Sequence, residues 1–500
     1  MPLYNPDLFW HLSSGRWIWA NGAIPRTDPF SFTHGGEAWF DFEWLFQVFV
    51  HAVNSVAGLW GLRFLKAALM GACWLPINGL LKDRDVPAPA RALALAFWAA
   101  AMLPQSDLRP DLFSLLFFSV LLRRLAKGET SPRLAIPLFA LWSNLHAGFV
   151  LGLALYAAKA LACRLENKPL PKGLVLEAGL AALGTLLNPY GWRVWEVAVL
   201  HGAQGAVISR YVQEWGGLSL RAPLQWPLQA ALALFIVVVW RRAAALPLFL
   251  ALVALPLALA TGLSVRFGAF FAASAAALVF AVETKPETRR ASVGLALLTG
   301  LLACSLLRVP WTRPFADAYV ARRAVEFVAR EEPVFAGLRL FNTYEWGGYL
   351  GWRRPGAKVF GDGRYLFHGQ LPETERALAS APAFTEFISR HRLDAVLIKN
   401  YPNRLPTKRR YKDGKENVFL RPWHLFLLPK ERWALVYFDE QALLFIDRAK
   451  VPSTWLDAHE YRWLRPGDED ALADALSRDE VPRAAVEAEA ARRAAESRPL

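Results

Sequence analysis

The sequence predicts a mainly α-helical polytopic membrane domain of about ten spans, followed by a soluble α/β domain. Of the 500 residues, 54% are hydrophobic and only 20% are charged, and the mean hydropathy of +0.22 exceeds that of ordinary soluble proteins. The apolar residues form long runs between residues 44 and 310, separated by short basic islands. Beyond Trp311 charge is distributed as in soluble proteins, which marks the second domain.

The composition divides the chain into successive regions. We expect an outer-face loop with an interfacial helix over 1–57, a transmembrane domain over 58–310, an extracytoplasmic α/β domain over 311–450 and a polar helical tail over 451–500. A span needs roughly 20 apolar residues. The candidate spans lie near 58–81, 90–104, 112–125, 133–143, 147–163, 173–187, 224–240, 244–261, 267–282 and 291–309.

Positive charge sets the predicted topology. Every second connection between the spans is basic, as in the loops 82–91, 123–133 and 164–172, which is the signature of a cytoplasmic loop. The other connections and the C-terminal domain then face outward, in a multi-pass protein of the inner (cytoplasmic) membrane. An outward-facing N-terminus leads us to expect a further span before Met1. The net charge of +14 follows from this topology and does not indicate nucleic-acid binding.

The cysteine pattern and the catalytic motifs exclude several classes of protein. Cys73, Cys163 and Cys304 all lie in apolar runs, so neither a disulfide framework nor a CxxC metal site is predicted. The sequence contains no Walker loop, HExxH, GxSxG or dinucleotide fingerprint.

Carboxylates stand among aromatic residues in the opening segment. Asp7 precedes "LFWHL", Asp28 lies in "TDPF", and Asp41 and Glu43 lie in "FDFEW". Acids beside apolar surface favour the raised pKa of a general base, or bind metals. We predict Asp7, Asp41 and Glu43 as catalytic residues, and Asp28 and His11 as substrate-binding residues. The alternative is that Asp28 forms a turn and Glu43 caps a helix, which leaves Asp7 unexplained.

Polar residues also interrupt the membrane domain at its predicted outer end. Asn144 and His146 break an apolar stretch, where unpaired polar groups are costly. Arg109 follows Asp107 in an outer loop, where the two could pair, and Arg266 ends a span. We expect Arg109, Asn144, His146 and Arg266 to bind substrate. The alternatives are that His146 bonds a helix end and that Arg266 extends to lipid headgroups.

The C-terminal domain alternates short β-like runs with helical stretches, which indicates an α/β fold. Gly, aromatic and charged residues concentrate in "FNTYEWGGYLGW" (341–352) and "VFGDGRY" (359–365), at predicted strand ends, where α/β folds bind ligands. We predict Asp362 and Arg364 as substrate-binding residues; the alternative is a tight turn in which they pair. The β-like runs are "EPVFAGLRLF", "AKVFGD", "DAVLIK", "WALVYFD" and "ALLFIDR".

The stretch "DLFWHLSSGRWIWANGAIPRTDPFSFT", followed by "DFEWLFQ", resembles the first outer loop of a broad family of uncharacterised bacterial membrane proteins. That family is related to the GT-C superfamily of polyprenyl-phosphate-sugar-dependent glycosyltransferases. Later stretches resemble the same family's landmarks in the same order: "LWSNLHAGFVLG", "TLLNPYG", "VQEW", "SVRF", "NTYEWGGYL" and "VFGDGR". The superfamily pattern places an acid or an acidic pair just after the first span. Asp7 occupies that place, and Asn5 stands where relatives often carry a second acid.

The resemblance implies a GT-C-like protein in the lipid bilayer that transfers a hexose or pentose, with inversion, from an isoprenoid phosphate to a glycan, lipid or protein acceptor on the non-cytoplasmic face. Asp7 would take the acceptor proton. The leaving phosphate would need cationic support from Arg266 or Arg109, or from a divalent metal ion (Mg or Mn) on Asp7 and Asp41. Two other functions fit the sequence: a lipid-linked glycan transporter, although no internal repeat is found, and a non-catalytic envelope glycan assembly or binding protein.

Overall fold

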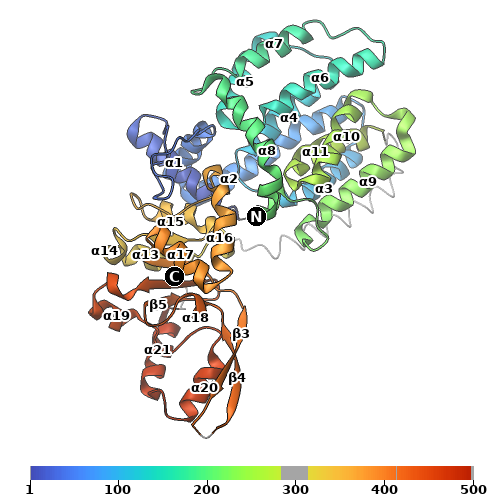
Figure 1. The fold of residues 1–500 in the computed structure, drawn as a ribbon. Helices are drawn as coiled ribbons and strands as arrows, with labels where there is room; N and C mark the ends of the chain where they lie inside the picture. Colours follow the sequence, from blue (N-terminus) through green and yellow to red (C-terminus); the bar gives the residue numbers. More distant parts are fainter. Residues whose placement is uncertain (1, 283–312, 413, 497–500) are drawn as a thin grey trace. The chain divides into compact units, whose positions relative to one another are not determined.

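The computed structural model describes residues 2–282, 313–412 and 414–496, which form two compact units (Figure 1). Unit 1 comprises Met1–Asn5, Ser14–Ile24 and Phe40–Phe315, and unit 2 comprises Pro6–Ser13, Pro25–Trp39 and Ala316–Leu500. The opening segment therefore contributes to both units, and helix α1 (Asp7–Asn21) begins in unit 2 and ends in unit 1.

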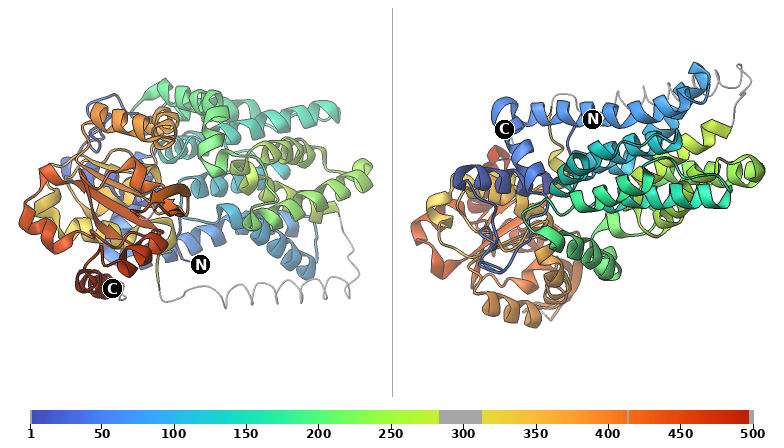
Figure 2. Two further views of the ribbon diagram at one scale, coloured as in Figure 1. Left: turned by 60° about the horizontal axis from the view of Figure 1, so that its bottom comes forward. Right: turned by 90° about the horizontal axis from the view of Figure 1, so that it is seen from above.

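Unit 1 is a bundle of helices that lie side by side (Figure 2). The longest, α2 (Trp44–Lys82), is interrupted at Gly58, whose positive φ of 59° is readily adopted only by glycine. The other helices are α3 (Ala88–Ala101), α4 (Asp111–Ala126), α5 (Pro132–Leu145), α6 (Phe149–Leu165), α7 (Leu174–Gly184), α8 (Val194–Tyr211), α9 (Trp226–Arg242), α10 (Leu248–Leu263) and α11 (Gly268–Val282).

The prediction of about ten spans is wrong for the described residues. Three helical segments are long and apolar enough to cross a membrane: Trp44–Lys82, Pro223–Ala245 and Val265–Val282. The other predicted spans fall on helices of 11 to 17 residues, such as α7 and α6. At 1.5 Å per residue these helices reach only about 16–25 Å, less than the roughly 30 Å hydrocarbon core. The predicted span over 291–309 lies outside the described residues.

Unit 2 is built around a four-stranded sheet in the order β1 (Leu340–Asn342), β2 (Ala395–Lys399), β6 (Ala442–Asp447) and β5 (Trp433–Phe438). β1 and β2 are parallel, and the other two pairings are antiparallel. β3 (Arg404–Arg410) and β4 (Glu416–Pro422) form a separate hairpin. The helices are α13 (Arg322–Arg330), α14 (Glu332–Phe335), α15 (Gly347–Arg353), α16 (Leu371–Leu378), α17 (Ala381–His391), α18 (His424–Leu427), α19 (Ser453–His459), α20 (Glu469–Ser477) and α21 (Arg483–Glu496).

The predicted C-terminal α/β fold is confirmed, with two local corrections. Three of the β-like runs become the central strands β2, β5 and β6, whose apolar residues are buried. In "EPVFAGLRLF" only the end is a strand, because Pro333 and its neighbours form the short helix α14. "AKVFGD" forms no strand and makes one isolated bridge, between Val359 and Ser31.

The loop over residues 25–39 is part of unit 2 because its backbone pairs with residues 359–360. Phe32 N donates to Val359 O at 3.1 Å, and Val359 N donates to Phe30 O at 3.0 Å. The Thr33 hydroxyl donates to Phe360 O at 2.6 Å. This pairing joins the acidic opening loop to the "VFGDGR" segment, more than 300 residues further along the chain.

Candidate functional site

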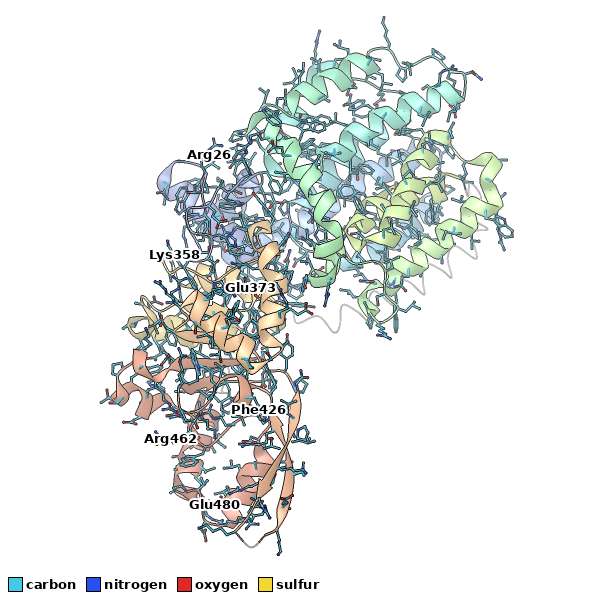
Figure 3. The ribbon with its side chains drawn as sticks, in the orientation of Figure 1. Arg26, Lys358, Glu373, Phe426, Arg462 and Glu480 are labelled. Carbon is cyan, nitrogen blue, oxygen red and sulfur yellow. The ribbon has the colours of Figure 1, made fainter. Side chains whose placement is uncertain are left out.

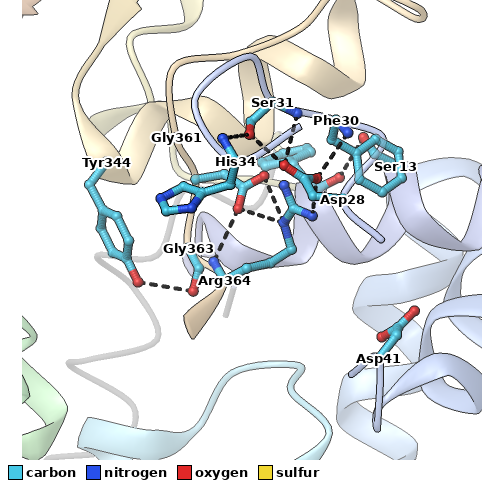
Figure 4. A network of polar contacts seen from close by, with 12 residues as sticks. Ser13, Asp28, Phe30, Ser31, His34, Asp41, Tyr344, Gly361, Gly363 and Arg364 are labelled. Carbon is cyan, nitrogen blue, oxygen red and sulfur yellow. Dashed lines mark hydrogen bonds and ion pairs between the residues drawn. The ribbon is translucent and has the colours of Figure 1, made fainter. Parts of the chain in front are cut away.

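A buried arginine with two carboxylates forms the polar centre of unit 2 (Figure 4). Arg364 Nη1 donates to Asp28 Oδ1 at 2.7 Å, and Arg364 Nε donates to Asp362 Oδ1 at 2.8 Å. No more than 4% of any of the three side chains is exposed. The guanidinium also lies over the rings of Trp39 and Phe30, at 4.7 and 5.1 Å. We call Asp28, Arg364 and Asp362 the acidic trio.

The two carboxylates of the acidic trio differ in their pKa. Burial acts to raise the pKa of Asp28, but the Arg364 charge and hydrogen bonds from Ser31 and Phe30 N outweigh burial and lower it. Burial raises the pKa of Asp362 despite the same guanidinium. The trio is closed to solvent and internally satisfied on both carboxylates, which is the geometry of a structural ion-pair network.

Asp7 begins α1 and lies against the glycine turn next to the acidic trio. A β-carbon built on Gly363 would stand 1.9 Å from Asp7 Oδ1 and 2.9 Å from Trp10 Nε1. Only glycine allows this approach. The Tyr344 hydroxyl donates to Gly363 O at 2.9 Å on the same turn (Figure 4). His11, on the next turn of α1, is buried with its ring 3.6 Å from that of Trp10.

Unit 1 holds a second arginine cluster of the opposite composition. Arg109 binds Glu214 through both terminal nitrogens, one of them at 2.7 Å, and Arg266 Nη1 lies 3.5 Å from Glu214 Oε1. Arg266 also lies 4.6 Å from the centre of the Trp215 ring. Between 20% and 29% of each of the three charged side chains is exposed. We call Arg109, Glu214 and Arg266 the basic trio.

The carboxylate of the basic trio is a strong acid. Burial acts to raise the pKa of Glu214, but the guanidinium groups of Arg109 and Arg266 outweigh burial and lower the pKa to about 2. With Glu214 ionised and both arginines charged, the trio carries a net charge of about +1.

The predicted pairing of Asp107 with Arg109 is wrong. Asp107 is buried and binds Lys66, with Nζ and Oδ1 3.1 Å apart. Its other carboxylate oxygen accepts hydrogen bonds from the backbone N–H groups of Tyr4 and Asn5. This network fixes residues 4 and 5 within unit 1, because a buried carboxylate requires such partners.

Asn144 and His146 have local hydrogen-bond partners in unit 1. Asn144 Oδ1 accepts from Trp44 Nε1 at 2.8 Å, and its amide donates to Ala140 O and Leu187 O. His146 Nδ1 lies 2.8 Å from Ser114 Oγ and accepts from Gly148 N at 3.1 Å. These contacts hold the ends of α4, α5 and α6 together.

Asp41 and Glu43 precede α2 in unit 1. Asp41 Oδ1 accepts from Gln47 Nε2, and Asp41 N donates to the Tyr190 hydroxyl at 2.9 Å. Glu43 occupies the N-cap position of α2, but its side chain makes no cap hydrogen bond. Glu43 therefore lies at the helix start, as the alternative expects, and its backbone carbonyl accepts from Gln47 N at 3.1 Å.

The comparisons with known proteins identify the fold. Neither a scan against protein-family models nor a search of curated proteins gives a match. Three solved structures of the Archaeoglobus fulgidus oligosaccharyltransferase are similar. The apo form has a TM-score of 0.53 at 13% identity, over 95% of this chain and 79% of that one. The enzyme, there named AglB, in complex with an inhibitory peptide and a dolichol-phosphate, has a TM-score of 0.51 at 13% identity, over 84% and 71%.

The third structure is the same enzyme tethered through a disulfide to an acceptor peptide with the NVT sequon, with a TM-score of 0.50 at 11% identity, over 85% of this chain and 71% of that one. The likeness shows that the chain has the fold of this oligosaccharyltransferase. This confirms the relationship predicted from the opening loop. The three helices of span length among the described residues indicate a membrane protein, in agreement with this fold.

The predicted site residues are divided between the two units. Asp7, His11, Asp28, Asp362 and Arg364 lie in unit 2, and Asp41, Glu43, Arg109, Asn144, His146 and Arg266 lie in unit 1. Sequence reasoning missed Glu214, the residue that joins Arg109 to Arg266. The available signal was its place in "VQEW", one of the landmarks that the resemblance rests on.

The predicted metal ligands do not form a cluster with other donors. Among residues 2–282, 313–412 and 414–496, no group of three or more His, Cys, Asp or Glu side chains is placed to hold a metal ion. Asp7 belongs to unit 2 and Asp41 to unit 1. The metal site on Asp7 and Asp41 stays a prediction, and the proposed reaction does not depend on it.

Proposed function

We propose that this protein is an integral membrane glycosyltransferase that transfers a sugar from an isoprenoid-phosphate donor to an acceptor on the non-cytoplasmic face of the cell membrane. The observation that carries the proposal is the GT-C fold, which extends over 84% to 95% of the chain. Two of the similar structures contain a dolichol-phosphate or an acceptor peptide. They support a lipid-linked donor here, with a glycan, a lipid or a protein as acceptor.

The proposed reaction is an inverting displacement. The acceptor hydroxyl oxygen forms a bond to the anomeric carbon while the bond from that carbon to the phosphate oxygen breaks. Asp7 takes the hydroxyl proton as general base. The electron pair of the broken bond stays on the phosphate, a stable anion that requires positive charge nearby more than it requires a proton.

The structure supports separate roles for two groups of residues. Asp7 is half-buried, and its carboxylate is held at the Gly363 turn, so its position is restricted before any substrate binds. Arg109 and Arg266 are partly exposed, share one carboxylate and keep net positive charge, which suits a phosphate. We assign the leaving phosphate to this arginine pair.

The test is sugar transfer by membranes that contain an Asp7→Asn variant, from a radiolabelled polyprenyl-phosphate sugar. We expect transfer to fall by about 100-fold or more, the usual contribution of a general base, with unchanged membrane insertion. Glu37→Gln is the matched control, because it neutralises an exposed acid elsewhere in the opening segment. Undiminished transfer by the Asp7→Asn protein would remove Asp7 from the mechanism.

A non-catalytic glycan-binding or assembly role is the second candidate. In that role the acidic trio would only hold unit 2 together, because its three residues face each other in closed ion pairs. In that case the wild-type protein would bind a lipid-linked glycan but show no transfer with any donor. The divalent metal ion stays a separate hypothesis, and loss of transfer on chelation with recovery on adding Mg²⁺ would support it.

A further inference from the structure

Arg465 is a buried cation in the C-terminal part of unit 2. It lies in the loop between α19 and α20 and is 3% exposed. Its Nε, Nη1 and Nη2 atoms are shielded from solvent, and none has a hydrogen-bond partner among the residues that the structure describes. A buried guanidinium with five N–H donors is costly unless these donors are paired.

His424 adds a second buried group without partners. It begins α18 directly after the β3–β4 hairpin and is fully buried, with neither ring nitrogen hydrogen-bonded within the described part of the chain. Burial, with the charges of Arg465 and Lys430, lowers the pKa of His424 to about 3. The imidazole is therefore neutral at pH 7 and offers one N–H donor. Phe426 and Arg462, neighbours of this pair in the chain, are labelled in Figure 3.

The acids around Arg465 are held by other partners. Asp468 Oδ1 accepts from Arg421 Nε at 2.8 Å. Glu460 forms a two-bond ion pair with Arg448. Glu489 accepts from the backbone N–H groups of residues 462–464, for example Arg462 N at 2.8 Å. Each of these carboxylates raises the pKa of Arg465, but burial is the larger effect and lowers it to about 10.

Positive charge therefore exceeds negative charge at this place. Lys430 is half-buried near Arg465 and His424, and burial with the Arg465 charge lowers the pKa of its amine. Unpaired donors, a neutral imidazole and a second cation are the chemistry of an oxyanion site, because oxyanions accept several N–H bonds at once. The almost complete burial of Arg465 and His424 leaves access only to a small ligand.

We propose that Arg465, His424 and Lys430 form a binding site for a small free oxyanion, of the class of phosphate, sulfate or a short carboxylate, that stabilises the C-terminal part of unit 2. Arg465 provides the charge and most of the hydrogen bonds. His424 donates one more N–H, and Lys430 closes the outer side with its ammonium group. The site is separate from the residues assigned to sugar transfer and does not depend on that assignment.

The test is thermal unfolding of the full-length protein in detergent, titrated with phosphate, sulfate or acetate at constant ionic strength. We expect a saturable rise in melting temperature of a few degrees with at least one of them, since a ligand that binds only the folded state stabilises it. Vesicles of phosphatidic acid, which present a phosphate on a lipid, should give no such rise, because an enclosed site admits only a small ion.

The Arg465→Met substitution should change the melting temperature in opposite directions with and without the anion. In anion-free buffer it should unfold at a higher temperature than the wild type, because a buried charge without a partner is removed. In saturating anion the order should reverse. Arg432→Met, which changes a half-exposed arginine bound to Asp447, should keep the wild-type titration.

Two outcomes would overturn the proposal. One is a wild-type melting temperature that does not respond to phosphate, sulfate or acetate beyond the effect of chloride. The other is an identical rise in the Arg465→Met protein. If that variant does not accumulate, calorimetric titration of the wild type with the three anions decides alone, and the absence of saturable heat would reject the site.

Discussion

The two arginine trios are built from the same groups in inverse proportion. In unit 2 one arginine lies between two carboxylates, and none of the three side chains is more than 4% exposed. In unit 1 two arginines share one carboxylate, and each side chain is 20% to 29% exposed. The acidic trio has more carboxylates than guanidinium groups, and the basic trio has more guanidinium groups than carboxylates.

The two trios contain the same types of charged group but differ in exposure. Exposure to solvent, more than residue type, therefore distinguishes a structural ion pair from a candidate binding site. Asp28 and Asp362 both pair with Arg364. Because all three side chains are buried, no donor of the trio faces solvent. Arg109 and Arg266 share the single carboxylate of Glu214, and all three side chains are partly exposed. An anionic ligand can therefore approach the basic trio without breaking a closed network.

The largest expected effect is on the stability of unit 2. Arg364→Leu leaves two buried carboxylates without a cation and should lower the free energy of unfolding by about 3–5 kcal/mol. The measurement is thermal and denaturant unfolding of the purified protein. Arg390→Leu is the control, because that arginine is exposed and its ion pairs are on the surface. Equal stability of the Arg364→Leu and wild-type proteins would show that the acidic trio does not hold the unit together.

The next effect is a pH dependence specific to the basic trio. The pKa of Glu214 is about 2 in the folded protein, against 4.5 ordinarily. Its stabilising contribution is therefore complete above about pH 4.5 and is lost as the pH falls toward 2. We expect Glu214→Gln to be less stable than wild type by up to about 3 kcal/mol at pH 7.

This stability difference should shrink at pH 3, because Glu214 of the unfolded chain, with a pKa of 4.5, is then mostly protonated while that of the folded protein is still mostly ionised. The measurement is unfolding of both proteins at the two pH values, followed by helical circular dichroism. Glu129→Gln, which changes an exposed acid of unit 1, is the control, and its stability difference from wild type should be the same at both pH values. A difference that stayed constant from pH 7 to pH 3 would contradict the lowered pKa.

A third effect links the Gly363 turn, next to the acidic trio, to the proposed chemistry. Gly363→Ala places a methyl group on Asp7 Oδ1 and must displace that carboxylate, so transfer should fall by about 100-fold. In Gly369→Ala the added methyl meets no atom within 4 Å, and this variant should transfer normally. If Gly363→Ala keeps full transfer while Asp7→Asn loses it, the position of Asp7 at this turn is not important for the reaction.

The smallest effect is the response of each trio to salt. Raising NaCl from about 0.05 to 1 M screens exposed charges far more than buried ones. The stability difference between wild type and Glu214→Gln should fall by less than about 1 kcal/mol, and that between wild type and Arg364→Leu should not change. Equal salt dependence in the two pairs of proteins would contradict the contrast in exposure between the trios.

Local patterns in the sequence are sufficient to predict where helices and strands occur. The apolar runs predicted the helices of unit 1, and the runs "DAVLIK", "WALVYFD" and "ALLFIDR" predicted the buried strands β2, β5 and β6, because hydrophobic patterning acts over a few neighbouring residues. The resemblance of the opening loop predicted the fold that the similar solved structures show. Helix length was predicted less well, since apolar composition does not show where a helix ends.

The pairing of charged residues depends on the folded structure. Asp28 and Arg364 are 336 positions apart, and Arg109 and Glu214 are 105 apart. Asp107 pairs with Lys66 and not with Arg109, which is two residues away in the sequence. Ion pairs form between side chains that packing brings within about 4 Å, and packing depends on how the whole chain folds. Local patterns in the sequence therefore do not predict the distances between these side chains.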